Sequence, residues 1–494
     1  MVAIACALVI LISNLAFASD EQRWKSLEQP VFTSPLSDST QIEGAIVSIA
    51  EDGQGFMWFV ARNGLWRWDS QSLTPALFVN SGADTPTPEA QVIYSDDYGN
   101  LWLGTKSGLY QFERDSHTFV AVAFEQLSFL SIENIIVTED NGQQQVFLSG
   151  DRSLHHFNPT DKTLTEIVLP DQTRIHALHA DKHNRLWVGT GKGLFFTSSI
   201  GAEPKTLRPE PTLLNIRISA LHTTLENELW IGTATEGYFT RDRQGNVQHK
   251  TVGSSSKQPW IYSLAEVAPN VVWLGTFGEG LVEIDINTGL QRRFNNNRLQ
   301  PASLADDNVW AIFQDSRGLV WIATANGINV FDSTVTAIKQ IYGGLNTGQG
   351  LKHRNVHTVN AFDQQLLVGT GPGGIEILDP VAGSQDTLWD ASTSAVETLY
   401  TAPDGSVYGS GNFTSVKVHT KDSGVTKLNV IGRSETAFTT AYAKTQHSLW
   451  LGGTDGLWRQ DLQFNAPATQ AFSTSAEERR VAYFWLMTRR YGLD

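Results

Sequence analysis

The apolar and polar positions of this chain alternate in short stretches, and the same order of stretches returns along most of its length. One repeat begins with the apolar stretch Val309–Phe313 and continues with a polar turn, Asp315–Gly318, that holds an aspartate and a glycine. A second apolar stretch centred on a tryptophan follows, and a glycine then opens a third stretch, as in Gly280–Asp285. Short alternating stretches between glycine and aspartate turns are typical of β-hairpins.

The repeat is about 44 residues long and occurs ten times. Its most regular part is an apolar residue, tryptophan, an apolar residue, glycine and threonine, as in Leu101–Thr105 and Leu229–Thr233. A looser fourth stretch completes each unit. Four short strands in a unit of this length are the signature of a β-propeller blade, so we predict an all-β fold of the β-propeller class.

The tryptophans of the repeat are predicted to be structural. A four-stranded blade cannot bury both of its faces alone, so it packs a large aromatic side chain against the next blade, and each such ring buries roughly 150–250 Å². The glycines that follow are expected to supply positive φ angles or close approach between blades. The tryptophans of the repeat are Trp58, Trp102, Trp187, Trp230, Trp273, Trp321 and Trp450.

The first residues have the pattern of an export signal. Val2–Leu15 is an almost unbroken apolar run, and Ala16–Ser19 supplies the small-residue spacing at which a signal peptidase cuts. We therefore predict a signal peptide over residues 1–18 and a periplasmic or extracellular location. No basic residue precedes the run, which departs from the usual signal, and a buried strand or helix is the alternative. Cys6 lies in this run and is the single cysteine, so the mature chain would have no thiol chemistry and no disulfide.

Charge and hydropathy exclude several partners. The chain has 36 basic and 51 acidic residues and a formal net charge of −15, which argues against nucleic acid or an anionic membrane surface as a partner. Hydrophobic residues make up 41% and charged residues 18%, so the chain can build a core. After residue 18, no stretch is long and apolar enough to cross a membrane.

The unit D-x-x-G-x-(apolar)-W-(apolar)-G-T-x-x-G-(apolar) closely resembles the two-component regulator propeller repeat, and the resemblance covers roughly residues 42 to 494. In that family, fourteen repeats usually build two seven-bladed propellers in the periplasmic sensor region of hybrid histidine kinases or diguanylate cyclases. The resemblance implies a ligand-sensing propeller of a signal-transduction receptor, which can be a homodimer. This chain ends after ten units and a fraction, so we interpret it as truncated and without its output module. The resemblance then implies that any membrane contact runs through the missing C-terminal segment.

The same resemblance implies the domain organisation. Residues 19–337 would form one seven-bladed propeller, and the strand around Gln29–Pro35 would close its ring by pairing with the last blade. Residues 338–494 would form an incomplete second propeller, with blades eight to ten and part of an eleventh. The eleventh is indicated by Phe484–Thr488 and the turn that follows it, for which an amphipathic tail is the alternative.

A ligand site is predicted where the first strands of units six, seven and eight begin. These strand starts carry aromatic side chains beside an arginine and a histidine, a combination that suits a small polar molecule or a saccharide. Inter-blade packing and surface charge are the alternative interpretation. The candidate residues are Trp260, Tyr262, Trp310, Arg354 and His357.

No metal, cofactor or catalytic site is predicted, and we do not expect this chain to be an enzyme. His176, His179 and His183 cluster in the sequence, but His179 recurs in register as His222, which is typical of a turn-flanking surface position. Gly369–Gly374 resembles a phosphate loop but opens no helix. The alternatives are a secreted lyase resembling streptogramin lyases and a free-standing propeller that binds carbohydrate or protein.

Overall fold

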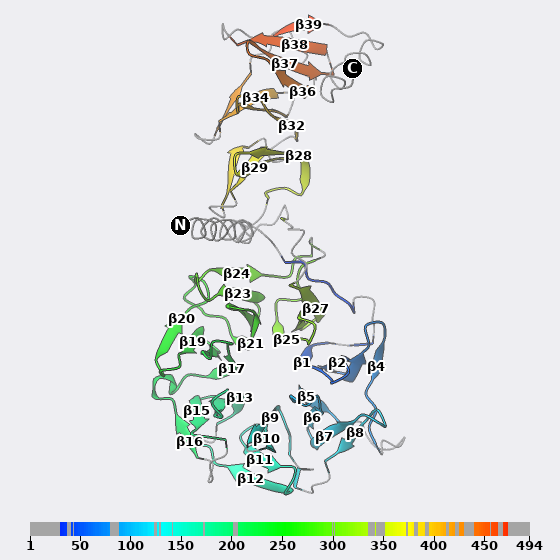
Figure 1. The fold of residues 1–494 in the computed structure, drawn as a ribbon, viewed down its shortest axis with the longest axis vertical. Coiled ribbons are helices and arrows are strands. Elements are labelled where there is room, and N and C mark those ends of the chain that lie inside the picture. Colours follow the sequence, from blue (N-terminus) through cyan, green and yellow to red (C-terminus); the bar gives the residue numbers. More distant parts are fainter. Residues whose placement is uncertain are drawn as a thin grey trace, which may run out of the picture. The chain divides into compact units, whose positions relative to one another are not determined.

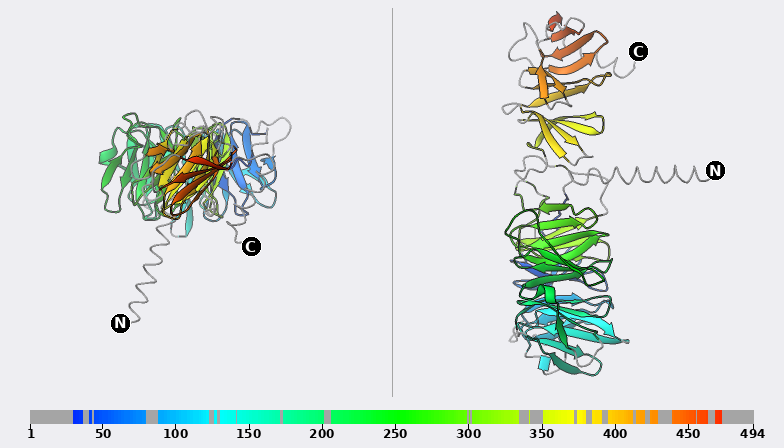
Figure 2. Two further views of the ribbon diagram at one scale, coloured as in Figure 1. Left: turned by 90° about the horizontal axis from the view of Figure 1, so that it is seen from above. Right: turned by 90° about the vertical axis from the view of Figure 1, so that its left-hand side faces the viewer.

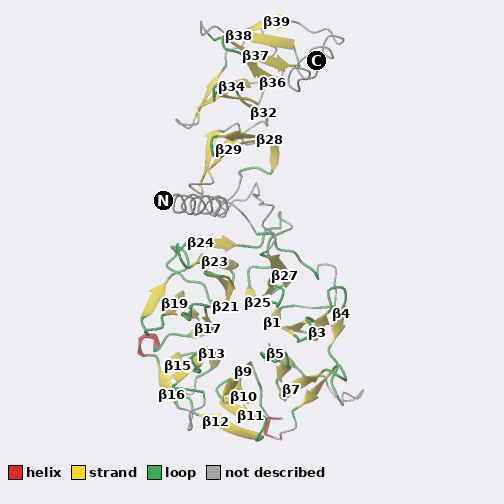
Figure 3. Ribbon diagram, viewed as in Figure 1, coloured by secondary structure: helices red, strands yellow, loops and turns green. Residues whose placement is uncertain are grey.

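The computed structural model describes residues 30–472, apart from 37–40, 43, 80–87, 123–125, 128–129, 141, 171–172, 201–205, 299, 301, 334–340, 342–350, 372–373, 380–383, 391–394, 412–413, 420–423, 429–438, 455 and 463–467. The regular structure of these residues is β-strand, with short 3₁₀ turns such as η2 (Pro211–Leu213) (Figure 3). The predicted all-β propeller fold is confirmed. The predicted signal peptide and eleventh unit lie outside the described residues. Over the described ranges, no helix has the length and hydropathy of a membrane span.

The chain divides into two compact units, and the first, Pro30–Ile338, contains seven antiparallel sheets. Each sheet is made of strands that follow one another in the sequence. The strands, sheet by sheet, are β1 (Ile46–Glu51), β2 (Met57–Ala61), β3 (Gly64–Trp68) and β4 (Leu73–Pro75); β5 (Ala90–Ser95), β6 (Leu101–Thr105), β7 (Gly108–Glu113) and β8 (Thr118–Ala121); β9 (Asn134–Asp140), β10 (Gln143–Ser149), β11 (Leu154–Asn158) and β12 (Thr163–Ile167); β13 (Ile175–Ala180), β14 (Leu186–Thr190), β15 (Gly193–Thr197) and β16 (Leu207–Pro209); β17 (Ile218–Thr223), β18 (Leu229–Thr233), β19 (Tyr238–Arg241) and β20 (Val247–Lys250); β21 (Ile261–Ala268), β22 (Val271–Thr276), β23 (Leu281–Asp285) and β24 (Gln291–Phe294); and β25 (Val309–Gln314), β26 (Leu319–Thr324) and β27 (Gly327–Asp332).

These seven sheets form a closed ring. The first strand of each sheet lies at the centre of the ring, and the last lies at its rim (Figure 1). The inner strands contact one another in the order β1, β5, β9, β13, β17, β21, β25 and back to β1. Two further views show the ring from its edge (Figure 2). The fold therefore brings the starts of all seven inner strands to one face.

The ring is closed by the segment that precedes its first sheet, as the sequence predicts. The backbone N–H of Thr33 donates to the carbonyl of Val330 at 2.9 Å, and the N–H of Val330 donates back at 2.8 Å. Phe32 is buried beside the rings of Trp273, Phe294 and Phe331. The N-terminal segment thus extends the sheet of β25–β27, which has three strands of its own.

The second unit, Lys339–Asp494, contains three further four-stranded sheets in its described part. The first strand of each sheet packs on that of the next, so β28 contacts β32 and β32 contacts β36. The strands are β28 (Asn355–Phe362), β29 (Gln365–Gly371), β30 (Gly374–Asp379) and β31 (Ser384–Trp389); β32 (Val396–Thr401), β33 (Val407–Gly411), β34 (Thr414–His419) and β35 (Gly424–Lys427); and β36 (Thr439–Lys444), β37 (Ser448–Gly453), β38 (Gly456–Asp461) and β39 (Thr469–Phe472).

The repeat tryptophans of the ring lie on second strands and are at most 3% exposed. The aspartate of the preceding turn binds both the turn and the indole. Oδ1 of Asp96 accepts hydrogen bonds from the N–H groups of Tyr98 and Asn100, and Oδ2 accepts one from Nε1 of Trp102 at 3.0 Å. In two sheets a glutamate replaces this aspartate as the acceptor. The carboxylate of Glu228 accepts the indole N–H of Trp230, and that of Glu283 accepts the indole N–H of Trp273. The recurring acidic residues therefore fix the orientation of the buried indoles.

In four of these sheets, a glycine two residues after the tryptophan permits close approach between sheets. A Cβ atom on Gly189 would lie 2.8 Å from Cγ2 of Ile218, which is on the first strand of the next sheet. The same distance separates a Cβ on Gly232 from Ile261. Real Cβ atoms do not approach this closely, so the packing of one sheet on the next requires glycine here.

Candidate functional site

A β-bulge at the start of the inner strands positions the candidate side chains. In six of the seven ring sheets the pairing of the first with the second strand shifts by one residue, and the shift falls on the second residue of the first strand. A bulge redirects the side chain that it releases from the ladder. The bulge residues are Val47, Gln91, His176, Ser219, Tyr262 and Trp310.

The residues just before the inner strands occupy equivalent positions from one sheet to the next. The carbonyl of Trp260 accepts a hydrogen bond from the N–H of Phe277 at 2.9 Å, across its own sheet. In the same way, the carbonyl of Arg217 accepts from the N–H of Ala234, and the carbonyl of Arg174 accepts from the N–H of Gly191. These residues and the bulge residues therefore line the same face of the ring, where the inner strands begin.

On this face, Trp260, Tyr262, Trp310 and Phe277 form an aromatic cluster. The rings of Trp260 and Tyr262 stack, with centroids 4.9 Å apart and planes inclined by 16°. Tyr262 lies 4.6 Å from Trp310 in the next sheet, and Phe277 lies 6.3 Å from Trp310. Phe277 is 52% exposed, and the other three are half-buried. The cluster thus offers aromatic surface that solvent can reach.

Arg217 joins the aromatic cluster to a row of polar side chains. Its guanidinium carbon lies 4.3 Å from the centre of the Trp260 ring, and its Nε donates to Nε2 of His176 at 3.2 Å. Beyond His176, Arg174 forms ion pairs with Glu133 at 2.9 Å and with Asp151 at 3.5 Å. We call Glu133, Arg174, His176 and Arg217 the polar arc. It continues the aromatic cluster around the same face of the ring.

The charge state of the face follows from its surroundings. Burial lowers the pKa of His176 to about 4, and the neighbouring Arg217 and Arg174 add to this shift. His176 is therefore neutral at pH 7 and can accept the hydrogen bond from Arg217. Burial also raises the pKa of Tyr262, although Arg217 opposes the shift, so the phenol keeps its proton. The face presents a guanidinium cation, a neutral imidazole and a phenol.

Two indole N–H groups of the cluster have no acceptor within the part of the chain that the structure describes. They are Nε1 of Trp260 and Nε1 of Trp310, and both atoms are buried. A buried donor without a partner costs roughly 1–3 kcal/mol.

The other two predicted site residues, Arg354 and His357, belong to the second unit. His357 is the bulge residue of β28, and its Nδ1 lies 3.3 Å from Oε2 of Glu397, the bulge residue of β32. The structure thus brings Trp260, Tyr262 and Trp310 together in the ring. Arg354 and His357 belong to the chain's other unit.

His179 and His222 lie near the turn-side ends of their strands, and both are half-buried and bond to a neighbouring sheet. Nε2 of His179 lies 2.8 Å from the hydroxyl of Thr223 in the next sheet, and Nε2 of His222 accepts from the N–H of Glu266 in the sheet after that. Burial lowers the pKa of each imidazole to about 4. They join neighbouring sheets as neutral groups. Over the described ranges, no group of three or more histidine, cysteine or acidic side chains is placed to hold a metal ion.

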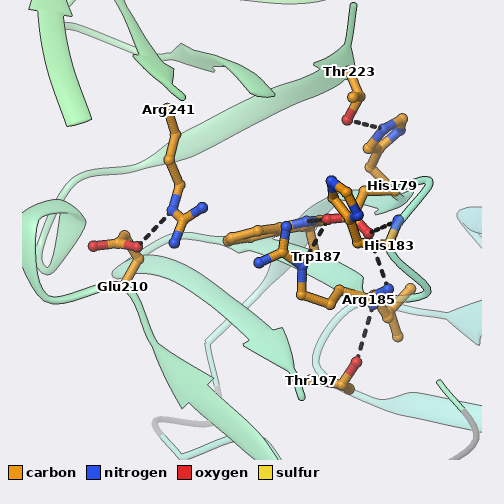
Figure 4. A network of polar contacts seen from close by, with 10 residues as sticks. His179, His183, Arg185, Trp187, Thr197, Glu210, Thr223 and Arg241 are labelled. Atoms are coloured by element: carbon orange, nitrogen blue, oxygen red, sulfur yellow. Dashed lines mark hydrogen bonds and ion pairs between the residues drawn. The ribbon is translucent and has the colours of Figure 1, made fainter. Parts of the chain in front are cut away.

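The surroundings of His179 show how polar groups support a buried indole (Figure 4). The guanidinium carbons of Arg185 and Arg241 each lie 5.2 Å from the centre of the Trp187 ring. Arg241 also forms an ion pair with Glu210, with Nε 3.0 Å from Oε2. Asp181 accepts from the Trp187 indole at 2.8 Å. These charges are paired within the chain, so this region is structural.

Arg217, Arg174, Glu133 and Phe277 are site residues that sequence reasoning missed. Arg217 and Arg174 precede their strands as Trp260 precedes β21, so alignment of the repeats on the residue before the inner strand would have found them. Phe277 follows the Gly-Thr pair of its own sheet. Its position across from Trp260 depends on the hairpin register.

Comparison with known proteins supports this architecture. The family model described as two component regulator propeller matches residues 303–326, which confirms the predicted repeat there. The chain is similar to the crystal structure of the extracellular domain of BT3049 from B. thetaiotaomicron, a protein assigned to the hybrid two component systems. The identity is 17% and the TM-score 0.69, over 91% of this chain and 61% of that one.

A second solved structure, also of an extracellular domain, is similar to this chain at low sequence identity. The extracellular domain of BT4673, from the same organism and also assigned to the hybrid two component systems, is 17% identical with a TM-score of 0.51, over 90% of this chain and 60% of that one. This chain therefore spans about three fifths of the length of these domains. A sequence comparison with curated proteins finds no match.

Proposed function

We propose that this chain is the extracytoplasmic ligand-sensing propeller of a signal-transduction receptor of the two component or diguanylate cyclase type. The ligand is a polar organic molecule, a saccharide in the first instance, and it binds on the face formed by the aromatic cluster and the polar arc. The likeness to two extracellular domains assigned to hybrid two component systems supports the class. The predicted export signal in residues 1–18 agrees with this location.

The observation that carries the proposal is the contact between Arg217 and Trp260 beside Tyr262 and Trp310. A sugar ring packs its C–H surface on an aromatic face, while its hydroxyls need donors and acceptors at the edge. The exposed guanidinium supplies donors, and the cluster supplies the apolar surface. Repeat packing alone does not require a cation over this ring.

Sensing requires that binding changes a contact in the propeller. Trp260 and Tyr262 belong to one sheet, whereas Trp310 lies in the next. A ligand that contacts all three would join the two sheets, and one that binds Arg217 would add a third. Differential binding of this kind can shift an equilibrium between two arrangements of the ring.

The test is a titration of the purified chain with a panel of neutral and acidic oligosaccharides, followed by tryptophan fluorescence and calorimetry. We expect one class to bind, and we expect Trp310→Ala and Arg217→Ala each to weaken binding by at least about tenfold. Arg243→Ala is the matched control, because Arg243 is an exposed arginine that pairs with Glu226 outside this face. Binding that survives both site variants, or no binding by any saccharide, would contradict the proposal.

A further inference from the structure

On the face of the aromatic cluster and the polar arc, Arg217 carries a positive charge that no carboxylate of the described residues neutralises. Its Nε donates to His176, a neutral imidazole, and its guanidinium carbon lies 4.3 Å from the centre of the Trp260 ring. Glu236, a hairpin residue of the same sheet, accepts from the hydroxyl of Thr235 and forms no ion pair with Arg217. Arg217 is exposed, so its two Nη groups are open to an acceptor from outside the chain.

Two other basic side chains of this face have carboxylate partners. The N–H of Lys106 donates to the carbonyl of Glu89, the residue before β5, and the two side chains form an ion pair. Arg174 pairs with Glu133 at 2.9 Å. Arg217 therefore leaves a positive charge on this face, although the chain has a formal net charge of −15.

The phenol of Tyr262 lies within reach of the Arg217 charge. Arg217 lowers the pKa of this phenol, although burial raises it more. The Tyr262 ring stacks on Trp260, the same ring that the guanidinium contacts. Tyr262 is half-buried, and its O–H has no acceptor among the residues that the structure describes. The guanidinium and the phenol can therefore donate to one group of a ligand.

A second arginine lies beyond the other side of the aromatic cluster. The N–H of Arg62 donates to the carbonyl of Ala45 at 3.2 Å, as the N–H of Phe277 does to the carbonyl of Trp260. Arg62 thus holds in its own sheet the position that Phe277 holds in the cluster. The contact of β25 with β1 makes this sheet the next one around the ring. Arg62 is exposed and forms no ion pair within the described ranges, so the cluster has such a cation in the sheet on either side.

We propose, resting on the proposed function, that the ligand of this face is an acidic oligosaccharide, a chain of sugars that carry carboxylates. Arg217 binds one carboxylate through its two Nη groups, with the Tyr262 phenol as a further donor, while the sugar rings pack on the aromatic cluster. A guanidinium edge matches the two oxygens of a carboxylate. Because Nε is already bound to His176, the remaining donors suit two oxygens better than the three of a phosphate or sulfate. Arg62 binds a second carboxylate further along the chain.

The test compares oligosaccharides that have the same rings but differ in charge. Tetramers of galacturonate and of mannuronate are titrated into the purified full chain by calorimetry, each beside its neutral methyl ester. We expect at least one acidic tetramer to bind at least about tenfold more tightly than its ester. This preference should shrink as the salt concentration rises from about 50 to about 500 mM, because salt screens charge pairing.

Variants locate the carboxylate contacts. Arg217→Gln should weaken binding of the acidic tetramer at least about tenfold and leave binding of the ester unchanged. Tyr262→Phe should weaken the acidic tetramer by a smaller factor, because one donor is lost. Arg62→Gln should weaken the tetramer but not the single sugar acid. Arg243→Gln is the control, since it removes the same charge outside this face, and unchanged thermal unfolding would establish that each variant folds.

The neutral sugars distinguish the charge of the ligand from its class. If an ester or another neutral saccharide binds as tightly as the acids, the face binds sugars but the preference for carboxylates is wrong. If acid binding survives Arg217→Gln combined with Arg62→Gln, the carboxylates are bound elsewhere and the proposal is overturned. If no saccharide binds, acidic or neutral, the proposed function itself fails.

Discussion

The ring of Pro30–Ile338 and the three sheets of the second unit are built from one repeat but differ in how their sheets are completed. In the ring every inner strand has a neighbour on each side, and the repeat tryptophans are at most 3% exposed. In the second unit, β28 exposes two valines and Trp450 is only half-buried. The difference teaches that a repeat's apolar surface is buried by the adjacent sheet and not by its own strands.

The comparison also separates structural from functional aromatic residues. Trp230 is 2% exposed, and Glu228 accepts its indole N–H. Trp260 and Trp310 lie at strand starts, are half-buried, and have no acceptor in the described part of the chain. Position within the repeat therefore distinguishes a packing tryptophan from one that a ligand can reach.

The largest expected difference between the two units is at the tryptophans. Trp230→Ala should lower the free energy of unfolding of the ring by about 3–5 kcal/mol, because it empties a fully packed site. Trp450→Ala should lower that of the second unit by only roughly 1–2 kcal/mol, since less apolar surface is buried there. Scanning calorimetry of the full chain, with transitions assigned by the variant that shifts each, measures both. Equal losses would mean that Trp450 is as well covered as Trp230.

The second prediction concerns how the stability of the ring depends on pH. His179 and His222 have folded pKa values lowered to about 4 by burial, against about 6.5 when unfolded. Between these values the unfolded chain binds protons that the folded ring does not, so stability falls as the pH falls from 6.5 to 4 and is constant for these groups below that. Asp181 faces His179 and Glu266 faces His222, and both oppose the shift.

Each histidine should contribute on the order of 3 kcal/mol to this loss, at about 1.4 kcal/mol per pKa unit. Denaturant unfolding of the wild-type chain and of His179→Gln from pH 7 to pH 4 checks it. The variant should show a shallower dependence, because it removes one of the two groups. If the free energy of unfolding falls with pH equally in both proteins, protonation of His179 costs the folded ring no stability.

The third prediction uses the glycines at the sheet contacts. Gly232→Ala should destabilise the ring by about 1–3 kcal/mol, because the new methyl group would lie 2.8 Å from Ile261. Gly452→Ala should change the stability of the second unit by less than about 0.5 kcal/mol, because among the described residues the added Cβ meets nothing closer than Ala441, at 3.6 Å. Thermal unfolding compares them. A large loss for Gly452→Ala would show that another part of the chain packs on this glycine.

The smallest expected effect is at the closure of the ring. Asn329 is fully buried, and its Nδ2 donates to the hydroxyl of Ser34 at 3.1 Å. Ser34→Ala should lower the stability of the ring by about 1 kcal/mol, because it leaves that donor without its acceptor. The transition of the second unit should not move. If Ser34→Ala shifted only the unfolding transition of the second unit, the closing segment would not stabilise the ring.

Much of the fold could be predicted from the sequence because the repeat is local. The Trp-x-Gly-Thr stretch, the turn aspartates and the strand alternation each lie within one sheet, and their period indicates the blade. Closure by the segment before β1 was also predicted. Tyr262 and Trp310 were identified because they open inner strands at equivalent positions.

The rest depends on contacts between sheets, whose partners lie about 40 residues apart in the sequence. The cation over Trp260 comes from Arg217 in the preceding sheet, and the partner of His179 is Thr223 in the next. The bulge that turns Tyr262 and Trp310 outward is a shift in pairing that no single residue marks. For this reason sequence reasoning did not find that Arg217 covers Trp260 or that His179 bonds to Thr223.

Hydrogen exchange of the full chain tests most directly the claim that each sheet is completed by its neighbour. We predict that β25, which has a sheet on each side, is strongly protected. We predict weaker protection of β28 and β37, because Val356 and Val359 on β28 are exposed and Trp450 on β37 is only half-buried. Protection of β28 and β37 equal to that of β25 would contradict the account.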